Sequence, residues 1–204
     1  MSSIALSVAT TTLVTVLGTG AWWWGTDGFS AFTAESARRV DILRAPRPLP
    51  NAVLEDQDGH LFRLQDLRGR LLAVEFIYTR CATVCRSLGD AFRQIRDRVP
   101  PETLGHDVVL LSISFDPERD DPASLKAYGL SHGADGTNWR VARVPDAAQL
   151  KALLDAFGIV AIADGLGGFE HNAAIHLVGR DGKLIEISDL DQPIAFAGKL
   201  ADAL

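Results

Sequence analysis

The sequence predicts an α/β protein preceded by one membrane-spanning helix, and three observations carry that prediction. None of the 20 Lys and Arg or 26 Asp and Glu residues precedes Asp27, so the chain opens with an uncharged segment. Two short apolar runs, residues 71–78 and 108–115, are typical of central strands that are covered on both faces. Amphipathic helical segments alternate with such strands, which indicates a partly parallel sheet with helices on both sides.

The first 26 residues are expected to form an N-terminal membrane anchor. Residues 4–24 carry no charge, and a helix of that length spans roughly 30 Å, about the thickness of the bilayer core. The run ends in Trp22, Trp23 and Trp24, and tryptophan favours the membrane–water boundary. A cleaved signal peptide is the alternative, but it would need Lys or Arg before the apolar stretch and a small-residue cleavage site.

Residues 27–50 are expected to form a proline-rich linker, and residues 51–204 a soluble domain. Alternate prolines in residues 45–50 (APRPLP) favour a stiff, extended tether. The domain opens with a strand–turn–strand hairpin, because apolar pairs flank Asp58-Gly59.

The remaining elements of the domain follow from periodicity and from capping residues. Apolar residues at spacings of three and four predict a helix over residues 88–99, which ends before Pro100. Further helices are expected to start at Pro122 and near Asp146, with a short strand over 139–142 between them. A hairpin over residues 174–187 and a closing helix complete the chain.

Composition excludes several classes of function. The formal net charge of −6 argues against binding a nucleic-acid backbone, which needs a basic face. Two cysteines alone exclude both a disulfide-stapled scaffold and a four-cysteine zinc site.

The strongest chemical signal is the pair Cys81 and Cys85, which directly follows the first central strand. That edge of an α/β sheet commonly holds functional sites, and a helix start lowers the pKa of a thiol. Arg80 and Arg86 add positive charge beside the thiols. On one helical turn the two Cα atoms would lie about 6 Å apart, which permits a disulfide or shared metal ligation. Two buried structural cysteines are the alternative.

Two thiolates leave a metal site incomplete, so one of the five histidines is a candidate third ligand. His60 and His106 are expected in solvent-exposed turns and loops, and His132 at a helix end. His176 lies within an apolar strand and is expected to be a hydrogen-bonded histidine on a sheet face, although it is the next candidate ligand after His171. His171 follows the glycine-rich GLGG loop and precedes a strand, so it is the candidate that could reach the cysteines.

Three segments of the chain resemble the SCO/SenC family of copper chaperones. FIYTRCATVC (76–85) resembles the family's cysteine motif, SISFDPERDDPASLKAYG (112–129) its Asp-Pro segment, and EHNAAIHLVGRDGKL (170–184) its histidine segment. They occur in the family's order, and the resemblance covers about residues 50–204. Prolines common after each family cysteine are replaced by Ala82 and Arg86, and His176 stands where an aromatic residue is usual.

The resemblance implies a thioredoxin-like sandwich, with a central mixed sheet between helices and an N-terminal hairpin. It also implies one copper ion held by Cys81, Cys85 and His171. Asp116 matches the family's Asp-Pro loop and is expected to support the site or contact a partner rather than bind the metal. Two thiolates and one imidazole are a soft donor set that suits Cu(I).

The function implied is that of a metallochaperone that delivers copper to the copper-centre subunit of cytochrome oxidase, or exchanges it with another copper carrier. The domain is then expected on the periplasmic side of a bacterial inner membrane, or in the mitochondrial intermembrane space of a eukaryote. The alternative is a thiol–disulfide reductase that acts on the cysteines of a copper centre. In that case Cys81 and Cys85 form a redox disulfide.

Overall fold

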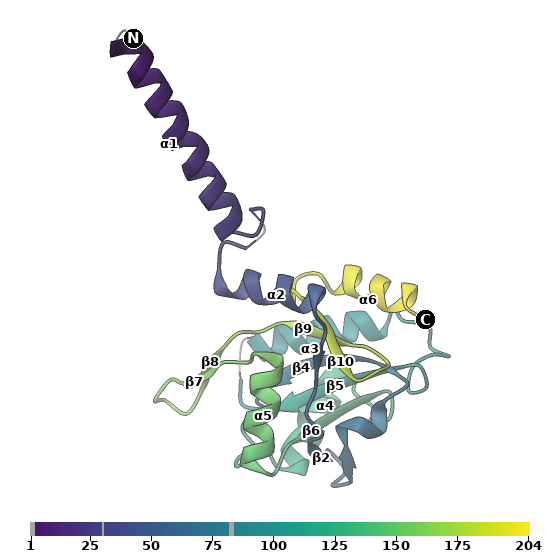
Figure 1. Ribbon diagram of the computed structural model, residues 1–204. Helices are drawn as coiled ribbons and strands as arrows, with labels where there is room; N and C mark the ends of the chain where they lie inside the picture. Colours follow the sequence, from purple (N-terminus) through teal and green to yellow (C-terminus); the bar gives the residue numbers. More distant parts are fainter. Residues whose placement is uncertain (1–2, 30, 82–83) are drawn as a thin grey trace. The chain divides into compact units, whose positions relative to one another are not determined.

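The computed structural model describes residues 3–29, 31–81 and 84–204, without the side chains of residues 84–86. The chain divides into two compact units, Met1–Ala45 and Pro46–Leu204. The first unit contains two helices, α1 (Ser3–Gly25) and α2 (Ala34–Arg44) (Figure 1).

Helix α1 coincides with the uncharged segment. It has 23 residues, none of which is buried, and it is long and apolar enough to cross a membrane. At 1.5 Å per residue it is about 35 Å long. A signal sequence satisfies the same criteria, so the anchor remains a prediction.

Helix α2 lies within the segment predicted as a linker. The Thr33 side chain caps it by accepting a hydrogen bond from the backbone N–H of Ser36. Glu35 in its first turn pairs with Arg38 and Arg39, three and four residues along the same helix face. These local contacts explain a helix in a segment with few apolar residues.

The second unit is built on an eight-stranded sheet with the strand order β1-β10-β9-β4-β5-β6-β2-β3. Strands β4, β5 and β6 are mutually parallel, and the other pairings are antiparallel, so the sheet is mixed as predicted. The strands are β1 (Arg47–Pro48), β2 (Val53–Asp56), β3 (Leu61–Arg63), β4 (Leu71–Ile77), β5 (Val108–Ser114), β6 (Trp139–Arg143), β9 (Ile175–Val178) and β10 (Lys183–Ser188).

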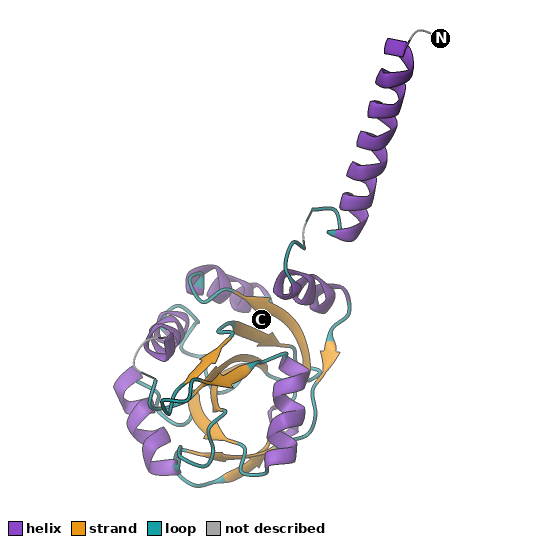
Figure 2. Cartoon of the chain, turned by 90° about the vertical axis from the view of Figure 1, so that its left-hand side faces the viewer, coloured by secondary structure: helices purple, strands orange, loops and turns teal. Residues whose placement is uncertain are grey.

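Helices cover both faces of the sheet. They are α3 (Val84–Arg96), α4 (Pro122–His132), α5 (Ala147–Phe157) and α6 (Pro193–Asp202), with a short 3-10 helix, η1 (Leu64–Leu67). Figure 2 shows the sheet strongly curled, with helices flanking it. Asp121 and Asp146 cap α4 and α5 as the sequence predicts. The predicted α/β fold is confirmed.

Aromatic contacts identify which helix lies on which face. Phe92 of α3 packs against Trp139 of β6, with ring centroids 5.7 Å apart. Phe157 of α5 packs against Phe76 of β4 at 5.0 Å. Successive strand residues point to opposite faces, so Glu75 points away from the face on which its neighbour Phe76 meets α5. Glu75 therefore lies on the same face as Trp139, the face that α3 covers.

A small second sheet stands apart from the main one. Strands β7 (Ala161–Ala163) and β8 (Phe169–His171) form an antiparallel hairpin between α5 and β9. This hairpin is not among the elements predicted from the sequence. We call residues 161–171 the β7–β8 hairpin.

Candidate metal centre

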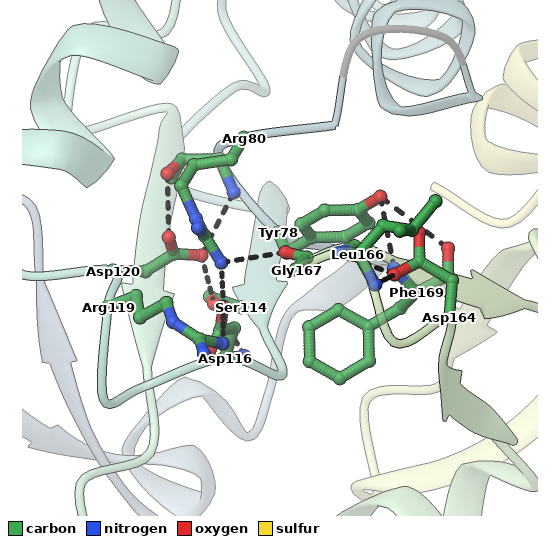
Figure 3. Close-up of polar contacts among 12 residues, drawn as sticks. Tyr78, Arg80, Ser114, Asp116, Arg119, Asp120, Asp164, Leu166, Gly167 and Phe169 are labelled. Carbon is green, nitrogen blue, oxygen red and sulfur yellow. Dashed lines mark hydrogen bonds and ion pairs between the residues drawn. The ribbon is translucent and has the colours of Figure 1, made fainter.

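The site lies where the parallel strands β4 and β5 end. Residues 78–81 follow β4 and residues 115–121 follow β5, and both loops meet at the same edge of the sheet. Asp120 joins them: it accepts hydrogen bonds from Thr79 N (2.9 Å), Thr79 Oγ1 (2.6 Å) and Ser114 Oγ (2.6 Å). Figure 3 shows these contacts. The Asp120 side chain is completely buried, so the backbone before Cys81 is firmly held.

Cys81 is half-buried in the loop between β4 and α3, and its N–H donates to the carbonyl oxygen of Tyr78. Cys85 is the second residue of α3, and its side chain lies outside the described residues. Cys81 itself is not helical, and residues 82–83 between it and α3 lie outside the described residues. The spacing of about 6 Å expected for one helical turn stays a prediction.

The Arg80 guanidinium contacts a carboxylate and a backbone carbonyl oxygen. Arg80 Nη2 lies 3.1 Å from Asp116 Oδ2 and 3.0 Å from the carbonyl oxygen of Gly167 (Figure 3). Arg119 approaches the same Asp116 oxygen at 3.5 Å. Asp116 is only 5% exposed. The two arginines at the rim of the site offset the charge of its carboxylate. The prediction that Arg80 and Arg86 favour the thiolates stays a prediction, because the side chains of Cys85 and Arg86 lie outside the described residues.

His171 ends strand β8 and faces an aromatic cluster formed by Tyr78, Phe115 and Phe169. Its ring centroid lies 5.0 Å from that of Phe115 and 6.3 Å from that of Tyr78. Both ring nitrogens are buried, and neither has a hydrogen-bond partner among the described residues. Burial lowers the pKa of His171 below its ordinary value, which favours the neutral imidazole that metal ligation requires.

The other histidines lie where the sequence analysis expects them. His60 and His106 are exposed, and His132 is the last residue of α4. His176 is completely buried on β9: its Nδ1 lies 3.2 Å from the carbonyl oxygen of Val74, and its ring packs against Phe157. Val74 is in the middle of β4, so His176 belongs to the core and lies away from the cysteine loop.

Among the described side chains, which do not include those of residues 84–86 and therefore not that of Cys85, no three from His, Cys, Asp or Glu form a group that could hold a metal ion. The structure does place His171 over the aromatic residue that starts the cysteine loop. The site therefore offers two chemical groups. One is the thiol of a loop that Asp120 holds in place, and the other is the neutral His171 imidazole, which has no hydrogen-bond partner among the described residues. Tyr78, Phe115 and Phe169 are functional neighbours that the sequence analysis missed, since ordinary core packing predicts the same aromatic residues.

Comparison with known proteins agrees with the resemblance. The family model SCO1/SenC matches residues 51–204. The "SCO1 protein homolog" of Bacillus subtilis is 28% identical over 134 residues, which cover 65% of this chain and 68% of that protein.

Solved structures share the fold. The copper-bound structure of Bradyrhizobium japonicum ScoI is 26% identical, with a TM-score of 0.66 over 77% of this chain and 99% of that one. A SCO1/SenC family lipoprotein from Bacillus anthracis superposes with a TM-score of 0.70 at 24% identity, over 79% of this chain and 98% of that one. The fold, the order of the motifs and the family match lead to one conclusion: this chain belongs to the SCO1/SenC family.

Proposed function

We propose that the chain is a membrane-anchored copper chaperone. In this proposal Cys81, Cys85 and His171 bind one Cu(I) ion, and the protein delivers it to the copper-centre subunit of cytochrome c oxidase during assembly. The domain stands outside the cytoplasm, on the periplasmic side of the inner membrane (the intermembrane space in a mitochondrion), with α1 as its anchor.

The observation that carries this proposal is the state of His171. A buried imidazole with no partner for either nitrogen among the described residues is costly, because buried polar groups are normally hydrogen-bonded. A bound metal ion would satisfy one of those nitrogens. The depressed pKa of His171 keeps that nitrogen deprotonated at neutral pH.

The donor set supports Cu(I) as the cargo. Thiolate sulfur is soft and suits Cu(I), whereas a structural zinc site needs a fourth ligand. The copper-bound structure of the Bradyrhizobium japonicum relative supports the same choice of metal. Three ligands at a loop edge also leave a face open through which the ion can be passed on.

The direct test is a Cu(I) competition titration on the reduced full-length protein in detergent. Wild type should bind one Cu(I) per chain, and Cys81→Ser or Cys85→Ser should abolish tight binding. His171→Ala should weaken binding by about a hundredfold, equivalent to about 2.7 kcal/mol. The matched control is His106→Ala, which removes an exposed histidine and should leave the affinity unchanged.

The same variants distinguish a chaperone from a thiol–disulfide reductase. A reductase needs both cysteines but tolerates the loss of His171, whereas a chaperone needs all three residues. Fast reduction of disulfide substrates by His171→Ala, together with weak copper binding by wild type, would favour the reductase.

A further inference from the structure

The β7–β8 hairpin is tied to the rest of its unit at three levels. At its base, Asn172 Oδ1 accepts from Val160 N (2.7 Å), and Asn172 Nδ2 donates to the Gly158 carbonyl oxygen (2.9 Å). Along its body, the Tyr78 hydroxyl accepts from Phe169 N at 3.3 Å. At its tip, Arg80 Nη2 donates to the carbonyl oxygen of Gly167. No strand of the main sheet pairs with the hairpin among the described residues, so these ties and ring contacts hold it.

The tip presents the Gly167 carbonyl oxygen in a defined position. The Asp164 carboxylate accepts from Leu166 N (2.7 Å) and Gly168 N (2.9 Å), which closes the turn (Figure 3). Gly168 packs so closely that a Cβ there would lie 2.6 Å from Asp164 Oδ2. The glycine-rich segment is therefore an organised tip, and its carbonyl oxygen is a fixed acceptor for Arg80.

Asp116, the second group that Arg80 contacts, is fixed as well. The Asp116 side chain is 6% exposed, and its backbone N–H donates to Ser114 Oγ at 3.0 Å. The Arg80 side chain is 46% exposed and bridges this buried carboxylate and the hairpin tip through one nitrogen, Nη2. A charge-assisted contact anchored on a buried carboxylate is stronger than a fully solvated ion pair.

The hydrogen bond from Arg80 to Gly167 connects the cysteine loop to the hairpin that carries His171. Arg80 directly precedes Cys81, and Gly167 lies four residues before His171. We propose that Arg80 is a positioning residue that locks the β7–β8 hairpin against the cysteine loop, and that opening this lock sets the rate at which the metal ion leaves. The second clause rests on the proposed function; the lock itself is a property of the metal-free protein.

The test of the lock is hydrogen–deuterium exchange of the reduced, metal-free, full-length protein in detergent. Arg80→Met keeps the aliphatic stem but removes the donor, so the amides of residues 164–171 should exchange about tenfold faster. Arg119→Met is the matched control: it removes a cation from the same Asp116 oxygen but leaves the contact with Gly167. Its hairpin should exchange at the wild-type rate.

Arg80→Lys supplies the conservative variant. Lysine provides a compact charge that reaches one of the two acceptors, so hairpin exchange should fall between that of wild type and Arg80→Met. A purely structural role would instead lower the melting temperature and leave the hairpin amides no faster than the rest of the domain. If the amides of residues 164–171 exchange at the wild-type rate in Arg80→Met, the proposed lock is wrong.

The consequence for the metal is tested by transfer of Cu(I) to an excess of a small-molecule Cu(I) chelator. Arg80→Met should release Cu(I) about tenfold faster than wild type and Arg119→Met, with the stoichiometry still one per chain. Equal release rates together with a loosened hairpin would overturn the link to release. A wild-type protein that takes up no Cu(I) would overturn the proposed function and that link, whereas the exchange data alone decide the lock.

Discussion

Ser112 Oγ lies 2.5 Å from Glu75 Oε1, inside the sheet on the face that α3 covers. The two residues are register partners on β5 and β4, and both are completely buried. Trp139 Nε1 extends this hydrogen-bond network by donating to Ser112 Oγ at 2.8 Å. Burial raises the pKa of Glu75 to about 8, although the hydrogen bond from Ser112 acts in the opposite direction. A carboxyl group in the core is therefore protonated at neutral pH.

Glu75 should make the stability of the fold fall with rising pH. Between its ordinary pKa of 4.5 and the raised value of about 8, the folded state binds a proton that the unfolded state has lost. The free energy of unfolding should then decrease over this window by up to about 1.4 kcal/mol per pH unit. Denaturant unfolding of wild type and Glu75→Gln from pH 5 to 9 measures the difference, because glutamine is neutral throughout.

The control for Glu75 is Glu102→Gln, which neutralises an exposed carboxylate on the surface. It should follow the wild-type pH dependence. A Glu75→Gln variant that keeps the same slope as wild type between pH 5 and 8 would show that Glu75 is not the buried acid.

Asp120→Asn should destabilise the second unit by about 3 kcal/mol, because an amide cannot accept all three hydrogen bonds that converge on this buried carboxylate. Asp121→Asn is a matched control on the adjacent residue. Asp121 caps α4, and asparagine caps a helix about as well, so its cost should be close to zero. Chemical denaturation reports both; equal costs would mean that Asp120 does not fix the cysteine loop.

Local patterns account for most of the fold. Apolar periodicity predicted α3, and Asp121-Pro122 and Asp146 located the starts of α4 and α5. The continuous apolar run predicted β4 as a central strand. Each of these signals lies within about a dozen residues, which is the range over which helix caps and strand periodicity act.

Elements that depend on distant partners were missed. Strand β1 has two residues and exists because Arg47 pairs with Leu184 on β10. Each strand of the β7–β8 hairpin has three residues, too few to show an alternating pattern. In the candidate site, the sequence selects His171 from the five histidines. It cannot show that both nitrogens are buried, or that Arg80 contacts Gly167 87 residues away.

The domain should lie outside the cytoplasm. Alkaline phosphatase fused after Leu204 should be active in a bacterial host, whereas β-galactosidase at the same point should be inactive. Arg38, Arg39 and Arg44 follow α1 and favour the opposite orientation, but long domains are translocated largely regardless of such charges. The reverse pattern of activities would place the domain in the cytoplasm and contradict delivery to a periplasmic subunit.

Oxidation and Cu(I) binding should exclude each other. A disulfide between Cys81 and Cys85 consumes both thiolates, so the oxidised protein should take up no Cu(I) until a reductant is added. Conversely, bound Cu(I) should protect both thiols from alkylation, and mass spectrometry counts the alkylated thiols directly.

Cys81→Ser provides the reference, because it cannot form the disulfide and leaves one thiol open to alkylation with or without copper. Equally tight uptake by the oxidised and reduced proteins would mean that the cysteines are not the site. Protection of one thiol alone would mean that the second cysteine serves disulfide exchange rather than ligation.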